Sequence, residues 1–357
     1  MEYPAVPAES KKQIDAAGEL LASDTAYIGG VEHARQLVAK WRACHLLPLR
    51  AIADDLRERL ERLGIESFVA MRLKRLFRIR DKLRQFPEMK ATRMQDIGAL
   101  RAVLPSLADV RRLVDDFERN PPDICESVSH KFYIDSPKDN GYRSQHIVFK
   151  YKGSDPSQYD GIRIELQIRT QLQHLWASAV EVTGLRTGSQ LKYDEGDPAW
   201  AGFFCLTAEL IARNEGCPSQ TALADIATAS LCTELVAAEE SLGAIEILRS
   251  PSHPITLTAV EVDEAAVTGK ETVLLNLDLG IPDLNAAFYS VEEQKQAMID
   301  YADAEQRQIF EDDNTSVVLV SINSVRMLHD AYPTFFLDTS KFAAVVETLF
   351  SGEGPSA

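Results

Sequence analysis

The segment from Lys131 to His146 carries the residue types with which proteins bind charged ligands that also contain a flat ring. Between its two ends it holds Lys138, Tyr142 and an arginine. A proline, an aspartate, an asparagine and a glycine near its middle are turn formers, so we expect a loop. Cationic side chains neutralise phosphates, and a tyrosine ring can stack on a base. The segment therefore predicts a nucleotide-binding loop.

A second segment, around Glu165, alternates between apolar and polar residues. The apolar set is Ile162, Ile164, Leu166 and Ile168, and the polar set is Arg163, Glu165, Gln167 and Arg169. Side chains alternate between the two faces of a strand, so this pattern predicts a half-buried strand. Its polar face would present a carboxylate, an amide and a guanidinium group. Together with the loop, this strand predicts one nucleotide site.

Three cations precede this site in the sequence. Arg72 and Lys74 are two residues apart in an expected strand, so they share a face, and Lys82 lies in the basic helix expected next. Converging cations are costly unless an anion neutralises them, and a triphosphate is the obvious candidate. The alternative is an ordinary solvated basic face.

Two carboxylates complete the set of candidate groups. Asp96 lies at the start of an expected strand, and Glu165 projects from another. Brought to one point, they could hold a Mg2+ ion that bridges phosphates, or either could accept a proton from an attacking hydroxyl. The plainer alternatives are that each is a cap or a surface acid, that Tyr142 only packs, and that His146 is a satisfied hydrogen-bonding histidine.

Length and composition limit the class of protein. A chain of 357 residues exceeds one average domain, and its 45% hydrophobic content suits a globular core. The sequence has no apolar run long enough for a transmembrane helix, and its N-terminus lacks the features of a signal peptide. The five cysteines are scattered, with no Cys-x-x-Cys motif, so we expect a reducing cytoplasm and no zinc site.

The net charge of −16 is distributed unevenly. Residues 72–93 contain nine Lys or Arg and two acidic residues, a local charge of +7. Residues 261–313 contain fourteen acidic residues and three basic ones, a local charge of −11. One part of the chain therefore attracts polyanions, whereas another resembles one.

The elements that must position these groups follow from apolar periodicity and capping signals, and they indicate an α+β protein. We expect helices within 10–62, a strand at 66–74, a helix at 76–86, a strand within 96–104, a helix at 107–118 capped by Ser106, strands at 146–151 and 162–169, a helix to about 183 capped by Thr170, and helices at 201–215 and 221–248. Beyond two prolines near 249–254 we expect strands at 255–260, 272–277 and 316–321, an acidic helix at 291–311, a helix at 324–331, an aromatic turn at 332–336 and a final helix at 339–350.

The order and spacing of the candidate residues resemble the synthetase domain of the RelA/SpoT family of pyrophosphokinases. The matching pieces are Arg72-x-Lys74 with Lys82, Asp96-Ile-Gly-x-x-Arg101, Tyr133-Ile-x-x-Pro-Lys138-x-Asn-Gly-Tyr142-Arg-Ser-x-His146 and Glu165-x-Gln-Ile-Arg169-Thr. The resemblance implies an α+β fold related to the DNA polymerase β-type nucleotidyltransferases, with a mixed sheet wrapped by helices. It also implies an enzyme that transfers the β,γ-pyrophosphate of ATP to a ribose 3′-hydroxyl and releases AMP.

The resemblance assigns roles to the candidate residues. For ATP, it implies that Arg72 and Arg101 sandwich the adenine, that Lys74 and Lys82 hold the phosphates, and that Asp96 and Glu165 bind Mg2+, with Glu165 also activating the acceptor hydroxyl. For the acceptor, it implies that Tyr142 stacks on the base and that Lys138 and His146 meet phosphates, with Lys131, Gln167 and Arg169 in the same site. The chain has Phe132 where the family often has Asp, which could alter acceptor contacts.

The flanking segments resemble a particular branch of the family. Segments around Trp41 and Trp176 look like the toxic small alarmone synthetases, which implies either the 3′ CCA end of tRNA or GDP/GTP as acceptor; core packing is the plain alternative for both tryptophans. No His-Asp cluster precedes residue 72, so we expect no hydrolase domain. A catalytically inactive nucleotide sensor is a further alternative.

The C-terminal part resembles the antitoxin-like domain of fused, CapRel-type synthetases, which senses a phage protein. Its Tyr332-x-x-Phe335 motif would then be autoinhibitory, although the two rings could equally staple the final helix to its own domain. We therefore expect an N-terminal helical region at 1–65, a pyrophosphokinase domain at 66–250 and a small α/β regulatory domain at 251–357.

Overall fold

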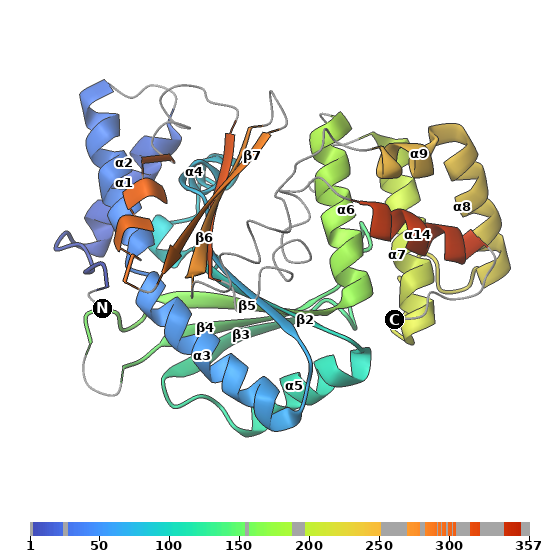
Figure 1. Cartoon of the computed structure of the whole chain (residues 1–357), viewed down its shortest axis with the longest axis horizontal. Helices are drawn as coiled ribbons and strands as arrows, with labels where there is room; N and C mark the ends of the chain where they lie inside the picture. Colours follow the sequence, from blue (N-terminus) through green and yellow to red (C-terminus); the bar gives the residue numbers. More distant parts are fainter. Residues whose placement is uncertain are drawn as a thin grey trace.

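The computed structural model describes most of the chain, namely residues 3–23, 28–153, 157–187, 197–250, 270–278, 283–290, 292–293, 295–297, 299–301, 303–304, 315–321 and 339–350. The fold is of the expected α+β class. It contains a five-stranded sheet, a three-stranded sheet and two groups of helices (Figure 1). None of the described helices combines the length and the apolar character that crossing a bilayer requires.

The five-stranded sheet is mixed, as the sequence predicts. Its strands are β1 (Phe68–Leu73), β2 (Gly98–Leu104), β3 (Cys125–Phe132), β4 (Gln145–Tyr151) and β5 (Arg163–Thr170). They lie in the order β1-β2-β5-β4-β3, with β2 and β5 parallel and the other neighbours antiparallel. Strand β3 was not predicted from the sequence. Lys131 lies within the end of β3 and His146 within the start of β4, so the loop between them is shorter than expected. The polar composition of β3 hid it, because it is an edge strand with exposed side chains.

One face of this sheet is apolar and forms the larger core. Leu100, Leu166 and Phe149 are fully buried there. Helix α3 (Leu46–Leu63) contacts β1 and β2, and helix α5 (Leu107–Arg119) contacts β2 and β5, so the two helices cover this face (Figure 1). The Ser106 side chain accepts a hydrogen bond from the backbone N–H of Asp109, which confirms the predicted cap of α5. The opposite face of the sheet is left for polar groups.

A group of N-terminal helices lies at the β1 edge. Helix α1 (Lys11–Ala22) packs on α2 (Ile28–Ala43) and on α4 (Leu76–Gln85). Helix α1 begins with a capping box between Ser10 and Gln13, which satisfies two backbone N–H groups that the helix leaves open. The basic helix expected at 76–86 is thus present, and it starts directly after Lys74 and Arg75.

Five helices form a second, separate hydrophobic cluster. They are α6 (Gln171–Thr187), α7 (Pro198–Glu215), α8 (Thr228–Leu242), α9 (Ala244–Arg249) and α14 (Ser340–Phe350), and Figure 1 shows them together on one side of the molecule. The continuous helix expected at 221–248 is wrong. Residues 221–225 form turns, and Gly243 at φ 60° ends α8, because this left-handed conformation suits glycine and terminates helices.

Three described segments of the C-terminal part form the three-stranded sheet. Its strands are β6 (Lys270–Asp278), β7 (Asp283–Ser290) and β8 (Thr315–Ser321), paired antiparallel in the order β7-β6-β8. The sequence reading missed β7, because its pattern is weak and Ala-rich. The described residues between 295 and 304 are helical, within the acidic helix expected at 291–311. The elements expected at 255–260, 324–331 and 332–336 lie outside the described residues.

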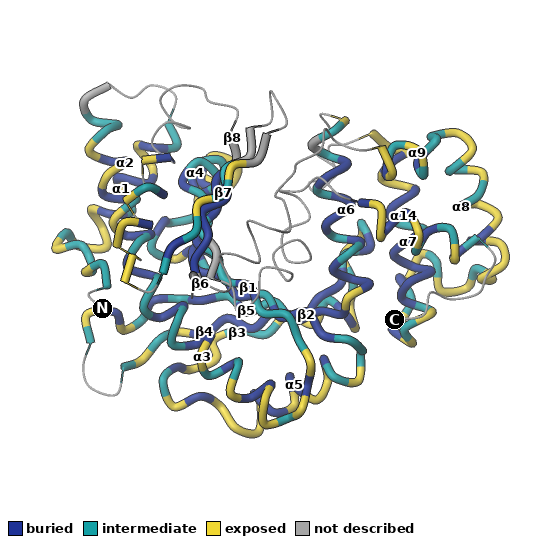
Figure 2. Tube along the Cα trace, viewed as in Figure 1, coloured by how far each residue is buried: buried dark blue, intermediate teal, exposed yellow. Residues whose placement is uncertain are grey.

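The C-terminal third of the chain packs on both halves of the fold. Strand β8 lies against β1 of the five-stranded sheet, whereas α14 contacts α6, α7, α8 and α9. In Figure 2 the middle of β6 is buried. Residues after 250 therefore contact the β1 edge through one element and the helical cluster through another.

Candidate active site

The strand register brings the predicted polar residues to one face of the sheet. Across the strands, Arg101 of β2 pairs with Gln167 of β5, Gln167 pairs with His146 of β4, and His146 pairs with Lys131 of β3. In the neighbouring row, Ala99 lies between Arg72 and Glu165. Directly paired residues point to the same side of a sheet, so residues far apart in sequence share one polar surface. This surface is opposite the apolar face that α3 and α5 cover.

Asp96 binds two of the predicted phosphate-binding lysines. Its Oδ2 accepts hydrogen bonds from Lys74 Nζ and Lys82 Nζ, both at 2.9 Å. Burial alone would raise the pKa of Asp96, but the two ammonium groups outweigh burial and hold that pKa well below its usual range. Burial lowers the pKa of Lys74, and Asp96 opposes this change. The Asp96 Oδ1 atom is buried and accepts no hydrogen bond from the described residues, so one carboxylate oxygen is left for a ligand.

Glu165 is held by its neighbours on β4 and β5. Its Oε1 lies 3.1 Å from His146 Nδ1, and its Oε2 accepts a hydrogen bond from Gln167 Nε2 at 2.8 Å. Burial is the largest single influence on the pKa of Glu165 and raises it, as does the charge of Asp96. The interactions with His146 and Gln167 together outweigh both and lower the pKa. The two carboxylates are therefore close enough for each to affect the other.

His146 joins Glu165 to the tyrosine of the loop. Its Nε2 lies 2.9 Å from the Tyr142 hydroxyl. With its proton on Nδ1, a neutral His146 donates to Glu165 and accepts from Tyr142, so all three side chains are satisfied. Burial raises the pKa of Tyr142, which keeps the hydroxyl protonated and able to donate.

The loop places Lys138 over two aromatic rings. Its ammonium group lies 4.9 Å from the centroid of the Tyr133 ring and 5.2 Å from that of Tyr142. The Tyr133 and Tyr142 rings are 6.0 Å apart in an edge arrangement, and Tyr133 lies 5.2 Å from the His146 ring. Such a site can bind a nucleotide, because the aromatic rings can stack on its base and the cation can neutralise its phosphates.

Three arginines lie near one another on the polar surface, namely Arg72 of β1, Arg101 of β2 and Arg169 of β5. The pKa of Arg169 falls to about 9, first because the side chain is buried and then because Arg101 and Arg72 add positive charge nearby. Arg169 also contacts His174 Nδ1. Like charges gather at such cost mainly where an anionic ligand compensates them, so the arginines point to a phosphate-rich ligand.

The candidate metal ligands are Asp96 and Glu165 alone. No set of three or more His, Cys, Asp or Glu side chains in the described parts of the chain could hold a metal ion. Mg2+ commonly takes only one or two protein carboxylates and completes its shell with water and phosphate oxygens. The open Oδ1 of Asp96 suits that arrangement.

A contact from the C-terminal region reaches this site and has no signal in the sequence. The Arg42 Nε group donates to the Lys74 carbonyl oxygen at 2.5 Å. Another nitrogen of Arg42 donates to the Tyr301 hydroxyl, and the Arg42 guanidinium carbon lies 4.6 Å from the Tyr301 ring centroid. Tyr301 is 2% exposed. A buried C-terminal tyrosine is thus two contacts away from the lysine that binds Asp96.

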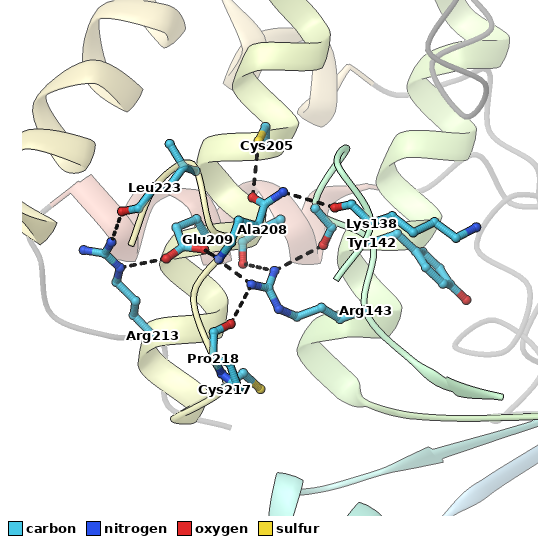
Figure 3. Close-up of polar contacts among 12 residues, drawn as sticks. Lys138, Tyr142, Arg143, Cys205, Ala208, Glu209, Arg213, Cys217, Pro218 and Leu223 are labelled. Atoms are coloured by element: carbon cyan, nitrogen blue, oxygen red, sulfur yellow. Dashed lines mark hydrogen bonds and ion pairs between the residues drawn. The ribbon is translucent and has the colours of Figure 1, made fainter. Parts of the chain in front are cut away.

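The residues that fix the loop between β3 and β4 were also not predicted from the sequence. Figure 3 shows Arg143 pointing towards Glu209 of α7, with Arg213 on the other side of that carboxylate. A glutamate within the apolar stretch of α7 was the only available signal, since acidic residues are seldom buried without a partner. Tyr332 and Phe335, proposed from sequence as autoinhibitory, lie outside the described residues.

Comparison with known proteins places part of the chain in a family. Residues 71–193 match the family described as the region found in RelA / SpoT proteins. This range includes the polar surface from Arg72 to Arg169. The chain therefore carries a RelA/SpoT-family domain, as its sequence motifs predict.

Individual relatives cover different shares of the chain. The GTP pyrophosphokinase YwaC of Bacillus subtilis is 31% identical over 91 residues, which are 26% of this chain and 42% of YwaC. The GTP pyrophosphokinase YjbM of the same organism is 29% identical over 147 residues, which are 37% of this chain and 68% of YjbM. The solved small alarmone synthetase 2 of Bacillus subtilis has 21% identity and a TM-score of 0.41, with 50% of this chain and 92% of that one covered. The chain thus spans less than half the length of YwaC.

Proposed function

We propose that this chain is an ATP-dependent pyrophosphokinase that transfers the β,γ-pyrophosphate of ATP to a ribose 3′-hydroxyl. The observation that carries the proposal is the arrangement of Asp96 with Lys74 and Lys82 on the same polar surface as Glu165. Phosphoryl-type transfer depends on positioning and charge neutralisation, and this surface supplies cations for phosphates beside carboxylates for a metal ion and a proton. The family assignment of residues 71–193 supports the same reaction class.

In this proposal the reaction is an in-line displacement at the β-phosphorus. The acceptor 3′-oxygen forms the new bond to that phosphorus, and the bond to the oxygen bridging the α- and β-phosphates breaks. AMP leaves with that bridging oxygen, and the hydroxyl proton passes to Glu165. Lys74 and Lys82 bind the phosphates of ATP, while Arg72 and Arg101 flank its adenine.

Mg2+ fits the site because Asp96 keeps one buried oxygen open and Glu165 faces the same surface. When bound by these carboxylates, the ion would neutralise the charge of the transferred group. The lowered pKa values of both carboxyls keep them ionised at neutral pH, as metal ligands and hydrogen-bond acceptors must be.

For the acceptor, we propose the 3′ CCA end of tRNA, which would make the chain a translation-inhibiting toxin of the fused, anti-phage type. The local charge of +7 over residues 72–93 suits tRNA, and it suits two bound nucleotides equally well. The names of YwaC and YjbM favour a second candidate, in which GDP or GTP accepts the pyrophosphate and the product is an alarmone. All five cysteines are free, which supports a cytoplasmic location.

The acceptor is tested by incubating the full-length protein with γ-32P-ATP, Mg2+ and either deacylated tRNA or GDP/GTP. We expect label on tRNA if the toxin proposal is right, and label on guanosine nucleotide if the second candidate is right. Binding of ATP without transfer to either acceptor, by both the wild type and the variant Tyr301→Ala described below, would contradict the enzyme and favour a nucleotide sensor.

We also propose that the acidic C-terminal region inhibits the ATP site in cis until a partner, such as a phage protein, releases it. The contact of β8 with β1 and the packing of Tyr301 on Arg42 support this proposal, because β1 leads directly into Lys74 and Arg42 donates to the Lys74 carbonyl oxygen. A tethered inhibitor needs little intrinsic affinity, since its effective concentration is on the order of millimolar. Tyr332 and Phe335 remain proposed ligands of the adenine slot.

Replacing Tyr301 by alanine tests this regulation while keeping α14 in the chain. We expect Tyr301→Ala to raise the transfer rate at least about fivefold, because the variant weakens the docked state that the inhibitor needs. Tyr289→Ala is the matched control, since Tyr289 is a buried tyrosine of the same region whose hydroxyl bonds Asp300 rather than Arg42. Equal or lower activity in Tyr301→Ala, with the fold intact by circular dichroism, would contradict inhibition in cis.

A further inference from the structure

The loop between β3 and β4, residues 133–144, carries the residues proposed to bind the acceptor and is called the acceptor loop below. It approaches helix α7 so closely that only glycine fits at position 141. Gly141 has φ +88°, and a Cβ at this position would lie 2.5 Å from the Ala208 Cβ atom. The turn is closed by hydrogen bonds from the Gly141 N–H to the Lys138 carbonyl oxygen and from the Lys138 N–H to the Tyr142 carbonyl oxygen. The loop residues proposed to bind the acceptor therefore rest directly on α7.

A buried ion cluster ties the loop to the same helix. Glu209 is 0% exposed, and its Oε2 lies 3.3 Å from Arg143 while its Oε1 accepts from Arg213 at 2.9 Å. Arg143 also donates to the carbonyl oxygens of Gly141, Ala208 and Pro218 (Figure 3). A buried carboxylate is costly unless it is paired, and this pairing spans the loop, α7 and the segment after α7.

Gln220 forms the second tie. Its Nε2 donates to the carbonyl oxygens of Lys138 at 3.1 Å and of Asp139 at 3.0 Å. Its backbone N–H donates to Glu209 Oε2 at 3.0 Å, and its Oε1 accepts a hydrogen bond from the Cys205 thiol at 3.3 Å. One glutamine thus links the ion cluster to the backbone of the residue whose ammonium group lies over Tyr133 and Tyr142.

Two of the residues that hold the loop, Glu209 and Gln220, lie outside the family match. The match ends at residue 193, whereas Glu209 and Gln220 belong to α7 and the segment after it. None of these groups is on the polar surface of the sheet. The contacts of Arg143, Glu209 and Gln220 join the loop, α7 and the segment after α7, so these residues support the loop rather than contact Asp96 or Glu165.

We propose that Arg143, Glu209 and Gln220 are positioning residues that fix the acceptor loop, so that helix α7 sets the affinity for the acceptor and leaves the affinity for ATP unchanged. The inference rests on the proposed function, because it assigns Lys138 and Tyr142 to the acceptor. The ATP groups Lys74 and Lys82 are supported by β1, α4 and Asp96 instead, so the two substrates depend on different scaffolds.

The variant Gln220→Ala tests the proposal without leaving a buried charge unpaired. Gln173→Ala is the matched control: Gln173 is likewise buried in the helical cluster, but its Nε2 donates to Glu215, and it does not contact the loop. KM for ATP and KM for the acceptor are measured for both variants in the full-length protein, with whichever of deacylated tRNA or GDP the wild type labels. Hydrogen exchange of the amides at 138–142 is measured in parallel.

For Gln220→Ala we expect KM for the acceptor to rise about tenfold, KM for ATP to stay unchanged, and loop amides to exchange about tenfold faster. Gln173→Ala should change none of these. Equal shifts in both KM values, or no change in acceptor KM and in loop exchange, would overturn the proposal. If neither the wild type nor Tyr301→Ala transfers to either acceptor, the proposed function fails. Amide exchange at 138–142 then tests the positioning role by itself. Faster exchange in Gln220→Ala but not in Gln173→Ala would support that role, and any other result would contradict it.

Discussion

Replacing Glu165 by glutamine is expected to lower the rate of pyrophosphate transfer by about a thousandfold or more, with ATP affinity changed only a few-fold. Glutamine has nearly the same shape, but it carries no charge and cannot take a proton from the acceptor hydroxyl. It also loses the charge-assisted hydrogen bond from His146. The measurement is transfer of label from γ-32P-ATP, combined with calorimetric titration of ATP.

A matched control separates this effect from a general change in charge. Glu126 lies on β3, is exposed and forms its ion pair with Lys150 at 2.7 Å, so Glu126→Gln removes the same charge from a carboxylate whose partner is none of the proposed substrate-binding residues. We expect this variant to transfer at the wild-type rate. A Glu165→Gln variant that retained more than a tenth of wild-type turnover would contradict a central role for this carboxylate.

Replacing Phe342 by alanine is expected to lower the free energy of unfolding by about 3–5 kcal/mol, which is the usual cost of emptying a large buried aromatic site. Phe342 is 1% exposed, and its ring stacks on Phe204 of α7 with centroids 5.9 Å apart. Phe204 also stacks on Trp200, so tryptophan fluorescence during urea unfolding reports on this cluster. Such a loss is a large fraction of the stability of a typical protein.

Phe86 provides the control for this prediction. It follows α4 and is 47% exposed, so Phe86→Ala should change the free energy of unfolding by no more than about 0.5 kcal/mol. A loss below 1 kcal/mol for Phe342→Ala, measured by the same urea titration, would mean that α14 adds little to the helical cluster.

The packing of α14 changes how inhibition by the C-terminal region should be examined. Cutting the chain after residue 250 removes the inhibitory elements, but it also removes Phe342 and uncovers α7, which supports the acceptor loop. Lost activity in such a truncation would then have two causes. Point changes at Tyr301 separate regulation from support, because they leave α14 in place.

Most of the site could be predicted from the sequence because its residues occur in short local patterns. The alternation around Glu165 indicated which residues share a strand face, and the burial of β5 confirms that assignment. The cap Thr170 is confirmed as well, since its hydroxyl accepts a hydrogen bond from the Gln173 N–H at 3.2 Å. Turn formers located the loop with Lys138 and Tyr142. Each of these signals spans only a few residues.

The misread elements had weak or conflicting local signals. Strand β3 is polar because it lies at a sheet edge, and β7 is Ala-rich, so neither shows a clear period. The helix expected across Gly243 failed because its apolar periodicity continues through a residue whose backbone ends α8. Glu209 was overlooked because one acidic residue in an apolar helix does not reveal its partner.

Local sequence patterns were enough to predict the α+β class, the family of residues 71–193 and the identities of the groups on the polar surface, because caps, turns and two-residue alternation are local properties of the chain. The folded structure was needed to establish the strand order, the pairing of Arg143 with Glu209, the contact of Arg42 with Tyr301, and the packing of described C-terminal residues in two cores. Arg143 and Glu209 are 66 positions apart, and for Arg42 and Tyr301 the separation is 259. Such pairings are fixed by the shapes and charges that meet when the whole chain packs, so no short stretch of sequence contains them.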